Sequence, residues 1–233
     1  MPPGALVGRT VESVEARAKH LMVRMSGGVT LHTHMMMTGS WHVYERGARW
    51  RKPAWQARLV IECGDHHAVC FDAPVVELLD DHLEREHPSL SSLGPDVLVD
   101  PFDLDEVMGR ARRTDPTTEA GDVLLDQGIV SGIGNIYRCE SLFIERVHPQ
   151  TPISAVDDAT LRSLVLTASR VMRANLVPAQ GFSRTFEGQP GKAWVYGRAG
   201  RPCLRCRTLI VAERTGRDAR TAYWCPKCQR SPQ

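Results

Sequence analysis

The sequence lacks any apolar run of about 18 residues, so no segment of its 233 positions is expected to cross a membrane. Residues 1–10 have no basic segment followed by an apolar one, and a secretory signal peptide is therefore not expected. Internal repeats and low-complexity tracts are also missing. These absences predict a cytoplasmic globular protein with no membrane partner.

Net charge is only +2, but the charges are unevenly distributed along the chain. Residues 1–60 carry nine Lys and Arg against three Asp and Glu, residues 61–126 carry four against 17, and residues 127–233 carry 16 against seven. Two basic blocks flank an acidic one, so a polyanion could lie between the basic surfaces of the folded chain. Two solvated basic faces explain the same pattern, and charge alone does not separate these interpretations.

Apolar periodicity divides the chain into a strand-rich part and a helical part. Five short segments bounded by turn residues predict the strands of a β-sandwich or barrel: 21–25, 29–35, 40–45, 57–63 and 67–72. Apolar residues at helical spacing predict four helices: 103–111, 119–127, 135–145 and 159–176. Asp157 or Asp158 is a plausible cap for the last helix, and residues 74–100 are expected to be irregular.

Four of the seven cysteines form two C-x2-C pairs separated by 18 residues: Cys203, Cys206, Cys225 and Cys228. Each pair places two thiolates on one tight turn, and two facing turns produce the closed tetrahedral site typical of structural zinc. Residues 208–213 and 220–225 predict a hairpin between the pairs, with Arg220 at its tip or just past it. Two disulfides or a redox pair are the alternatives, and a cytoplasmic chain disfavours disulfides.

The segment LLDQGIVSGIGNIYRCESL at 124–142 predicts a helix to about Ile129, a glycine-rich turn and a new helix from about Asn135. Free N–H groups at the start of the second helix suit a phosphate, and Asn135 could cap that helix and donate to the phosphate. When the segment is taken alone, an ordinary tight turn between helices is the favoured interpretation.

The stretch LHTHMMMTGSW at 31–41 allows three interpretations from its residues alone. It could form a soft-metal site with His32 and His34, a piece of core, or a surface that contacts something flat and apolar.

Taken together, the segments resemble the formamidopyrimidine-DNA glycosylase and endonuclease VIII family. The resemblance runs in family order from about residue 7 to residue 228 and is carried by RAKHLMVRM, LHTHMMMTGSW, GPDVL, LLDQGIVSGIGNIYRCESLF and RTAYWCPKC. It implies an α+β fold with an N-terminal antiparallel β-sandwich, a C-terminal helix-two-turn-helix bundle and a zinc-finger β-hairpin. We expect these parts at residues 1–88, 89–180 and 181–233, the last beginning with a loop region that governs lesion preference.

The resemblance, closest to the endonuclease VIII branch, also implies an activity. Members of the family are DNA glycosylases and AP lyases of base excision repair, which remove oxidised bases and cleave the strand at abasic sites. The DNA is bent, the damaged nucleotide is flipped out, and side chains fill the gap. We therefore expect a monomer with one structural Zn²⁺ that acts on damaged double-stranded DNA at the nucleoid.

Individual family roles map onto five residues of this chain. Met37 matches the side chain that fills the vacated space, so the DNA-facing interpretation of 31–41 is favoured over the soft-metal one. Lys19 matches the lysine tied to the sugar-phosphate and to proton transfer in β-elimination. Arg220 matches the finger arginine, which binds the phosphates flanking the flipped nucleotide and assists δ-elimination. Asn135 matches a phosphate ligand, and His34 is expected near a phosphate.

The start of the chain departs from the family pattern. Family members begin Met-Pro-Glu, and the proline nitrogen is the nucleophile that forms a Schiff base with the sugar. This chain begins Met-Pro-Pro-Gly, and 16 residues separate Pro2 from Lys19 where the family has several tens. The nucleophile is therefore not assigned to Pro2, nor the acid to Pro3, and either the start is assigned too late or the chain is a shortened paralogue.

The alternative function follows from that departure. A chain without its nucleophile could still bind damaged DNA through Met37, Asn135 and Arg220, as a catalytically impaired paralogue. A zinc-ribbon scaffold is a further alternative, but it rests on the cysteines alone.

Overall fold

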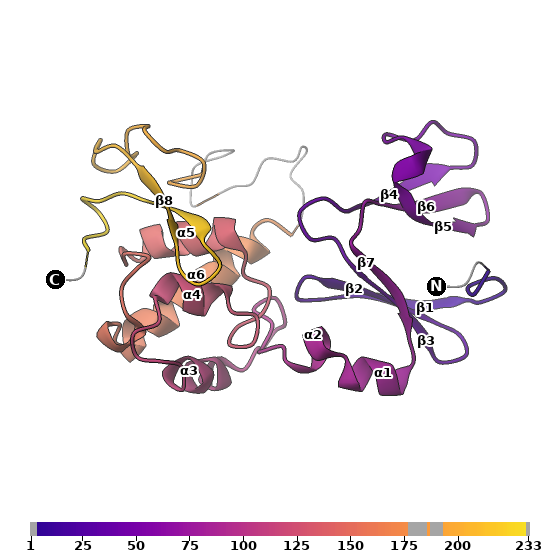
Figure 1. Ribbon diagram of the computed structural model, residues 1–233, viewed down its shortest axis with the longest axis horizontal. Coiled ribbons are helices and arrows are strands. Elements are labelled where there is room, and N and C mark those ends of the chain that lie inside the picture. Colours follow the sequence, from indigo (N-terminus) through magenta and orange to yellow (C-terminus); the bar gives the residue numbers. More distant parts are fainter. Residues whose placement is uncertain (1–3, 177–185, 187–192, 232–233) are drawn as a thin grey trace. The chain divides into compact units, whose positions relative to one another are not determined.

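The computed structural model describes residues 4–176, 186 and 193–231, and the chain divides into two compact units, Met1–Ser91 and Ser92–Gln233 (Figure 1). Antiparallel strands make up most of the first unit, and helices followed by a hairpin make up the second, which confirms the α+β prediction. None of the described helices is long and apolar enough to cross a membrane. The predicted further division of the second unit at residue 181 stays a prediction.

Two antiparallel sheets form the first unit. The four-stranded sheet has the order β1 (Val11–Arg17), β2 (His20–Met25), β3 (Val29–His34), β7 (Val75–Leu79). The three-stranded sheet has the order β4 (Ser40–Glu45), β6 (His66–Phe71), β5 (Ala57–Cys63), with a 3-10 turn at Ala54–Gln56. All five predicted strands are present within one residue of their expected bounds.

One shared core joins the two sheets. Alternate residues of β2 and β3, among them Val23 and Leu31, pack with Trp41 and Ile61 of the other sheet. The Trp41 indole nitrogen also donates to the Thr33 hydroxyl at 3.1 Å. Strand alternation puts these apolar side chains on one face of each sheet, so the sheets pack face to face as the predicted β-sandwich.

The prediction of irregular structure at 74–100 is wrong in its first half. This stretch contains β7, α1 (Asp81–Glu86) and α2 (Pro88–Ser91). The strand is a five-residue segment with Glu77 at its centre that pairs with β3, and the two helices are too short for helical periodicity to show in the sequence. Asp80 caps α1 by accepting from the backbone N–H groups of His82 and Leu83.

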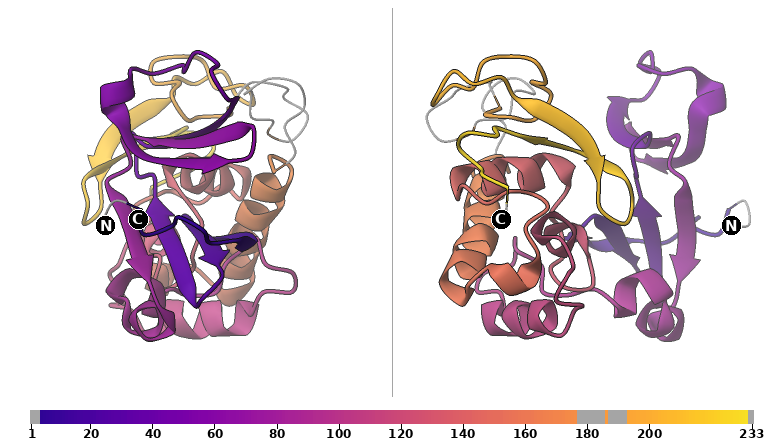
Figure 2. Two further views of the ribbon diagram at one scale, coloured as in Figure 1. Left: turned by 90° about the vertical axis from the view of Figure 1, so that its right-hand side faces the viewer. Right: turned by 60° about the vertical axis from the view of Figure 1, so that its left-hand side comes forward.

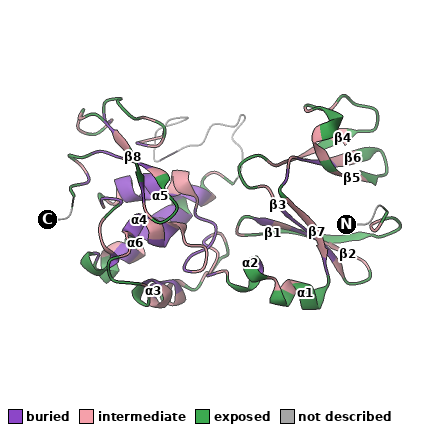
Figure 3. Cartoon of the chain, viewed as in Figure 1, coloured by how far each residue is buried: buried purple, intermediate pink, exposed green. Residues whose placement is uncertain are grey.

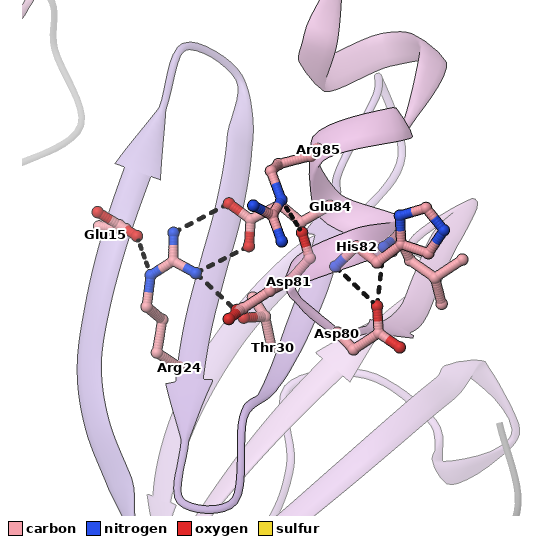
Figure 4. A network of polar contacts seen from close by, with 9 residues as sticks. Glu15, Arg24, Thr30, Asp80, Asp81, His82, Glu84 and Arg85 are labelled. Carbon is pink, nitrogen blue, oxygen red and sulfur yellow. Dashed lines mark hydrogen bonds and ion pairs between the residues drawn. The ribbon is translucent and has the colours of Figure 1, made fainter.

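Arg24 fastens α1 to the four-stranded sheet. Its guanidinium makes a two-point ion pair with Glu84, at 2.8 and 3.0 Å, and also reaches Glu15 on β1 at 2.6 Å (Figure 4). Bidentate arginine–carboxylate pairs are among the strongest polar contacts, and this one is partly shielded from solvent. The segment that follows β7 is therefore held against the sheet.

Helices around one apolar core make up most of the second unit. They are α3 (Leu104–Arg112), α4 (Ala120–Leu125), α5 (Asn135–Ile144) and α6 (Asp158–Arg173), with a 3-10 turn at Ile153–Ala155. Figure 3 shows that buried residues concentrate on α4, α5 and α6. Asp157 caps α6 by accepting from the Thr160 N–H, which confirms one of the two predicted caps.

A hairpin of β8 (Val211–Thr215) and β9 (Arg220–Trp224) completes the second unit. Strand β9 packs on α5, and Figure 2 shows the hairpin, in yellow, beside the helices of its own unit. The hairpin begins and ends next to the four clustered cysteines.

Candidate functional site

The glycine-rich turn before α5 is built by two segments lying side by side. Ser131 N–H donates to the Pro95 carbonyl at 2.9 Å, and Gly94 N–H donates to the Gln127 carbonyl at 2.8 Å. A Cβ atom on Gly94 would overlap the Ile129 carbonyl, so only glycine allows this approach. The GPDVL segment therefore serves as a support for the turn.

The turn differs from prediction at both ends. Helix α4 ends at Leu125 instead of near Ile129, because the Gln127 side chain accepts from Gly132 N–H and donates to the Ile133 carbonyl, which holds the chain in a turn. The N-cap of α5 is Gly134, so the prediction that Asn135 caps this helix is wrong. Asn135 is the first helical residue, and its side chain is used elsewhere.

Asn135 contacts the hairpin. Its side-chain nitrogen donates to the Thr221 carbonyl at 2.9 Å, and Arg138 donates to the same oxygen at 3.2 Å. Arg138 is fully buried, so it reaches this carbonyl from inside the unit. Because Arg220 immediately precedes Thr221, the start of α5 and the predicted phosphate-binding arginine are joined by these two hydrogen bonds.

Arg220 is the first residue of β9 and is exposed. It pairs across the hairpin with Thr215, just past the four-residue tip 216–219, as predicted. Gly216, in this tip, has φ +74°, and a Cβ there would overlap the Asp122 carboxylate of α4. The same carboxylate accepts from the Arg217 backbone N–H at 2.8 Å, so the tip is docked on α4.

The four predicted metal ligands come together at the base of the hairpin. The sulfur atoms of Cys203, Cys206, Cys225 and Cys228 all lie within 4.8 Å of one another, and none forms a disulfide. The Cys203–Cys228 and Cys206–Cys225 sulfurs are 4.0 and 3.4 Å apart. Tetrahedral thiolates about 2.3 Å from a zinc ion would be about 3.8 Å apart, so the cluster has the size and donor set of a metal site.

Local contacts and burial shift the pKa values of the cysteine thiols in opposite directions. Hydrogen bonds from the Thr208 side chain and backbone lower the pKa of Cys206 to about 6, whereas burial raises the pKa of Cys225 and Cys228. The Gln229 side chain accepts from Cys225 N–H at 3.0 Å and donates to the Val147 carbonyl at 2.8 Å. The second cysteine turn is thereby attached to the chain that follows α5.

A buried carboxylate orients the chain that leads into the first cysteine turn. Glu140 of α5 is fully buried and accepts from three consecutive backbone N–H groups, those of residues 194–196, at 2.7 to 3.0 Å. Burial raises the pKa of Glu140, and the three N–H groups oppose that shift. Part of the predicted lesion loop at 187–200 is thus fixed from residue 193, while 187–192 lie outside the described residues.

In the first unit the structure brings Lys19 and His34 together. Lys19 is exposed in the turn between β1 and β2, and His34 ends β3 opposite His20. Burial, the neighbouring His32 and the Lys19 charge lower the pKa of His34. His34 is therefore near enough to Lys19 for the lysine charge to affect its pKa, and the resemblance ties that lysine to the sugar-phosphate.

Met37 is at the apex of the turn that follows β3. Gly39 N–H donates to the Met35 carbonyl at 2.8 Å and closes the turn, which leaves the Met37 residue 85% exposed. A Cβ on Gly39 would overlap that carbonyl, so the glycine of the motif is needed to make the turn. An apolar side chain held out into solvent has the form expected of a group that contacts DNA bases.

Comparison with known proteins places the chain in a family. Its residues 3–74 match the model of the formamidopyrimidine-DNA glycosylase N-terminal domain, and residues 93–187 match that of the H2TH domain of the same enzymes. A probable endonuclease 8 2 of Streptomyces coelicolor is 38% identical over 97% of this chain and 82% of the relative. The chain belongs to the formamidopyrimidine-DNA glycosylase and endonuclease VIII family.

Other family members match over a similar span. Endonuclease 8 of Escherichia coli is 31% identical over 96% of this chain and 85% of its own length. Among solved structures, the Lactococcus lactis Fpg in complex with DNA containing an abasic site superposes with a TM-score of 0.81 at 23% identity, over 97% of this chain and 84% of that one. That structure supports the fold predicted for this family member.

Sequence reasoning missed three residues that shape the site: Asp122, Arg138 and Glu140. Each makes its contact with a segment more than 50 residues away, so no local pattern indicated it. A charged residue inside an apolar helical segment, as at 138 and 140, was the available signal.

Proposed function

We propose that this chain is a DNA glycosylase and AP lyase of base excision repair, acting on oxidised bases and abasic sites in double-stranded DNA. The observation that carries the proposal is membership of the family, with both family domains matched. Curated relatives carry these activities in their names, among them the DNA-(apurinic or apyrimidinic site) lyase of Mycolicibacterium smegmatis, 32% identical over 96% of this chain. The non-enzymatic binder is not favoured by these relatives.

The positions of the side chains support separate roles for residues of the two units in this function. In the first unit, Lys19 contacts the sugar-phosphate and takes part in proton transfer, His34 lies near a phosphate, and Met37 enters the space left by the flipped nucleotide. In the second unit, Arg220 binds the flanking phosphates through its planar guanidinium. Asn135 contributes chiefly by holding Thr221, and the backbone N–H groups at the start of α5 are proposed to bind a phosphate.

The metal held by the four cysteines is a structural Zn²⁺. Four thiolates in a closed tetrahedral set favour zinc and leave no position for a reacting water, so the ion stabilises the hairpin. Replacing Cys225 with serine is expected to release the ion and unfold the hairpin. Metal content measured with a chelator assay, alongside the circular dichroism of the variant, tests this role.

A DNA substrate also bears on the cellular location that we expect for the protein. We expect it in the bacterial cytoplasm with the nucleoid, acting as a monomer.

Borohydride trapping is the decisive test of the activity. The purified chain is incubated with a duplex carrying one abasic site, reductant is added, and a covalent complex is sought on a denaturing gel. A Schiff base between a protein amine and the sugar would be reduced to a stable bond, so a covalent band and a nicked strand are expected. An intact duplex of the same sequence is the control.

A negative result in the trapping test would point to the alternative function. No band and no nicking, with binding to the damaged duplex retained, would leave the damaged-DNA-binding alternative. Replacing Lys19 with alanine is expected to slow strand cleavage by about 100-fold or more, the range for a lost proton-transfer group. Binding to the duplex should weaken much less, because only one sugar-phosphate contact is lost. Lys52→Ala is the matched lysine control, because Lys52 is paired with Asp72 at 3.0 Å.

A further inference from the structure

Three side chains from separate segments of the first unit converge on one point. They are His32 of β3, Glu77 of β7 and His87, which follows α1. The atoms they offer lie within 4.8 Å of one another. His32 Nδ1 and His87 Nε2 approach the same Glu77 carboxylate oxygen, at 2.7 and 2.9 Å.

The fold fixes each of these positions. His32 and Glu77 are direct partners across the β3–β7 pairing, so their side chains lie on the same face of the sheet. His87 is placed by α1, and α1 is fastened to that sheet through the Arg24–Glu84 ion pair (Figure 4). The convergence is therefore set by one strand register and one helix attachment.

The donor set is that of a divalent transition metal. Two imidazole nitrogens and a carboxylate oxygen are the protein ligands of many zinc sites that keep one further position for water. The 2.7 and 2.9 Å separations are hydrogen-bond lengths, whereas tetrahedral zinc ligands are about 3.3 Å apart. The carboxylate must therefore move by about half an ångström, which its 38% exposed side chain allows.

The surroundings hold the His32 ring in the required orientation. His32 is buried, and its other ring nitrogen, Nε2, lies 2.7 Å from His20 Nδ1. Metal-binding histidines usually have such a partner on the second nitrogen, which fixes the ring and leaves the first nitrogen for the ion. On His87, Nε2 points to Glu77, and within the described residues Nδ1 is buried without a hydrogen-bond partner.

Among the described residues, Glu77 also has no permanently charged cation paired with it. Within the described stretches, the ion pairs recorded for its carboxylate are those with His32 and His87, and both need a protonated imidazole. Arg24, on the same sheet, forms its ion pairs with Glu84 and Glu15 instead of with Glu77. A divalent cation between the carboxylate and two neutral imidazoles would supply the missing positive charge.

We propose that His32, Glu77 and His87 form a second metal site, for a divalent cation of the zinc class. The ion links β3, β7 and the segment after α1 within the first unit. This site shares no ligand with the four cysteines, and it uses His32 without the methionines of the neighbouring motif. It depends neither on activity toward DNA nor on what the cysteines bind.

Zinc stoichiometry of the full chain tests the site. The parent and variants are saturated with Zn²⁺, freed of unbound ion by gel filtration and analysed by mass spectrometry for metal per chain. Glu77→Gln and His87→Ala are each expected to hold about one ion fewer than the parent, because a three-ligand site that loses a ligand binds zinc far more weakly. His82→Ala is the matched control, since this 72% exposed histidine on α1 is outside the cluster, and it should retain the parental content.

The readout is the difference in zinc content between parent and variant, so the outcome does not depend on how fully the four cysteines are loaded with zinc. Ring-nitrogen NMR of the parent adds a direct view, because zinc should shift the His32 Nδ1 and His87 Nε2 resonances and leave those of His82 unchanged. Equal zinc content in the parent, Glu77→Gln and His87→Ala would overturn the proposal, as would unchanged ring resonances. Cobalt substitution separates the two sites, because only thiolate ligation produces a sulfur-to-cobalt charge-transfer absorption.

Discussion

The side-chain nitrogen of Asn135 donates a hydrogen bond to the Thr221 carbonyl at 2.9 Å, which joins the first residue of α5 to the second residue of β9. The residue next to Thr221 is Arg220, so helix start and finger arginine are positioned by one contact. Arg138 reaches the same oxygen from the buried side of α5. The site in the second unit is thus a junction between two elements, each of which depends on the other.

Removing this junction should affect stability and DNA binding together. Asn135→Ala loses a hydrogen bond to a backbone carbonyl, and the free energy of unfolding should fall by about 1 kcal/mol. Affinity for an abasic-site duplex should also fall, because Arg220 is held less firmly. Asn175→Ala is the control, since Asn175 donates to the Val171 carbonyl at 2.7 Å, away from the hairpin. Equal losses of DNA affinity in both variants would contradict the junction role.

The finger arginine should matter for binding and not for folding. Arg220→Ala is expected to weaken binding to damaged duplex by about 1–3 kcal/mol, as the loss of a charge-assisted phosphate contact does, with metal content unchanged. Arg214→Ala is matched to it, because Arg214 is also exposed and lies directly across the hairpin from Thr221. Fluorescence anisotropy at two salt concentrations measures both variants. If Arg214→Ala lost as much affinity as Arg220→Ala, general charge would explain the effect.

Because the hairpin tip is docked on α4, alanine should cost different amounts of stability at two glycines with similar backbone conformations. Gly216 and Gly200 have φ of +74° and +70°, but only a Cβ on Gly216 meets the Asp122 carboxylate. Alanine costs about 1 kcal/mol at either position through the left-handed backbone. Gly216→Ala should cost about 1–2 kcal/mol more in urea unfolding, because the tip must lift from α4. Similar unfolding midpoints for the two variants would argue against tip docking.

The buried carboxylate of α5 should be a strong stabilising group. Glu140→Ala leaves three buried or partly buried backbone N–H groups without their acceptor, so a loss of about 3 kcal/mol or more in unfolding free energy is expected. Glu213→Ala is the control, because Glu213 is an exposed residue of β8. Thermal melts followed by circular dichroism compare them, and a melting temperature for Glu140→Ala within error of the control would contradict this role.

One histidine of the second unit predicts a pH dependence of stability. Burial against Trp224 lowers the pKa of His148 below its ordinary value of about 6.5, although Glu213 opposes the shift. The unfolded chain therefore binds this proton at a higher pH than the folded chain, and unfolding free energy falls as pH drops below about 6.5. Between pH 6.5 and 5, His148→Gln should lose less stability than the parent in urea unfolding. Parallel pH profiles would show that His148 does not contribute.

Much of the architecture follows from local patterns in the sequence. Strands such as 57–63 and helices such as 135–144 are encoded by alternation or helical spacing within one segment, and the structure places them where these patterns predict. The cysteine cluster is equally local, because each C-x2-C pair determines its own turn. Strand β7 was missed because VVELL is a short segment interrupted by Glu77, without clear alternation, and it becomes a strand only through pairing with β3.

The contacts that shape the site could not be derived in the same way. Asn135 is a good capping residue by type, yet its amide goes to a carbonyl 86 residues away, and Gly134 takes the cap position. The docking of Gly216 on Asp122 and the convergence of His32 with His87 are likewise products of tertiary packing. The sequence motifs identified the residue types, and long-range packing determined their partners.

The hairpin is anchored at its tip by Asp122, along β9 by Asn135 and Arg138, and at its base by Gln229. It is therefore not an exchangeable module, although its sequence is short and contiguous. A chimera that took residues 203–228 from a relative would place foreign backbone against native α4 and α5. Grafting fingers between family members should succeed only when both helices are transferred with them, and changes in the finger and in these helices should accumulate together during divergence.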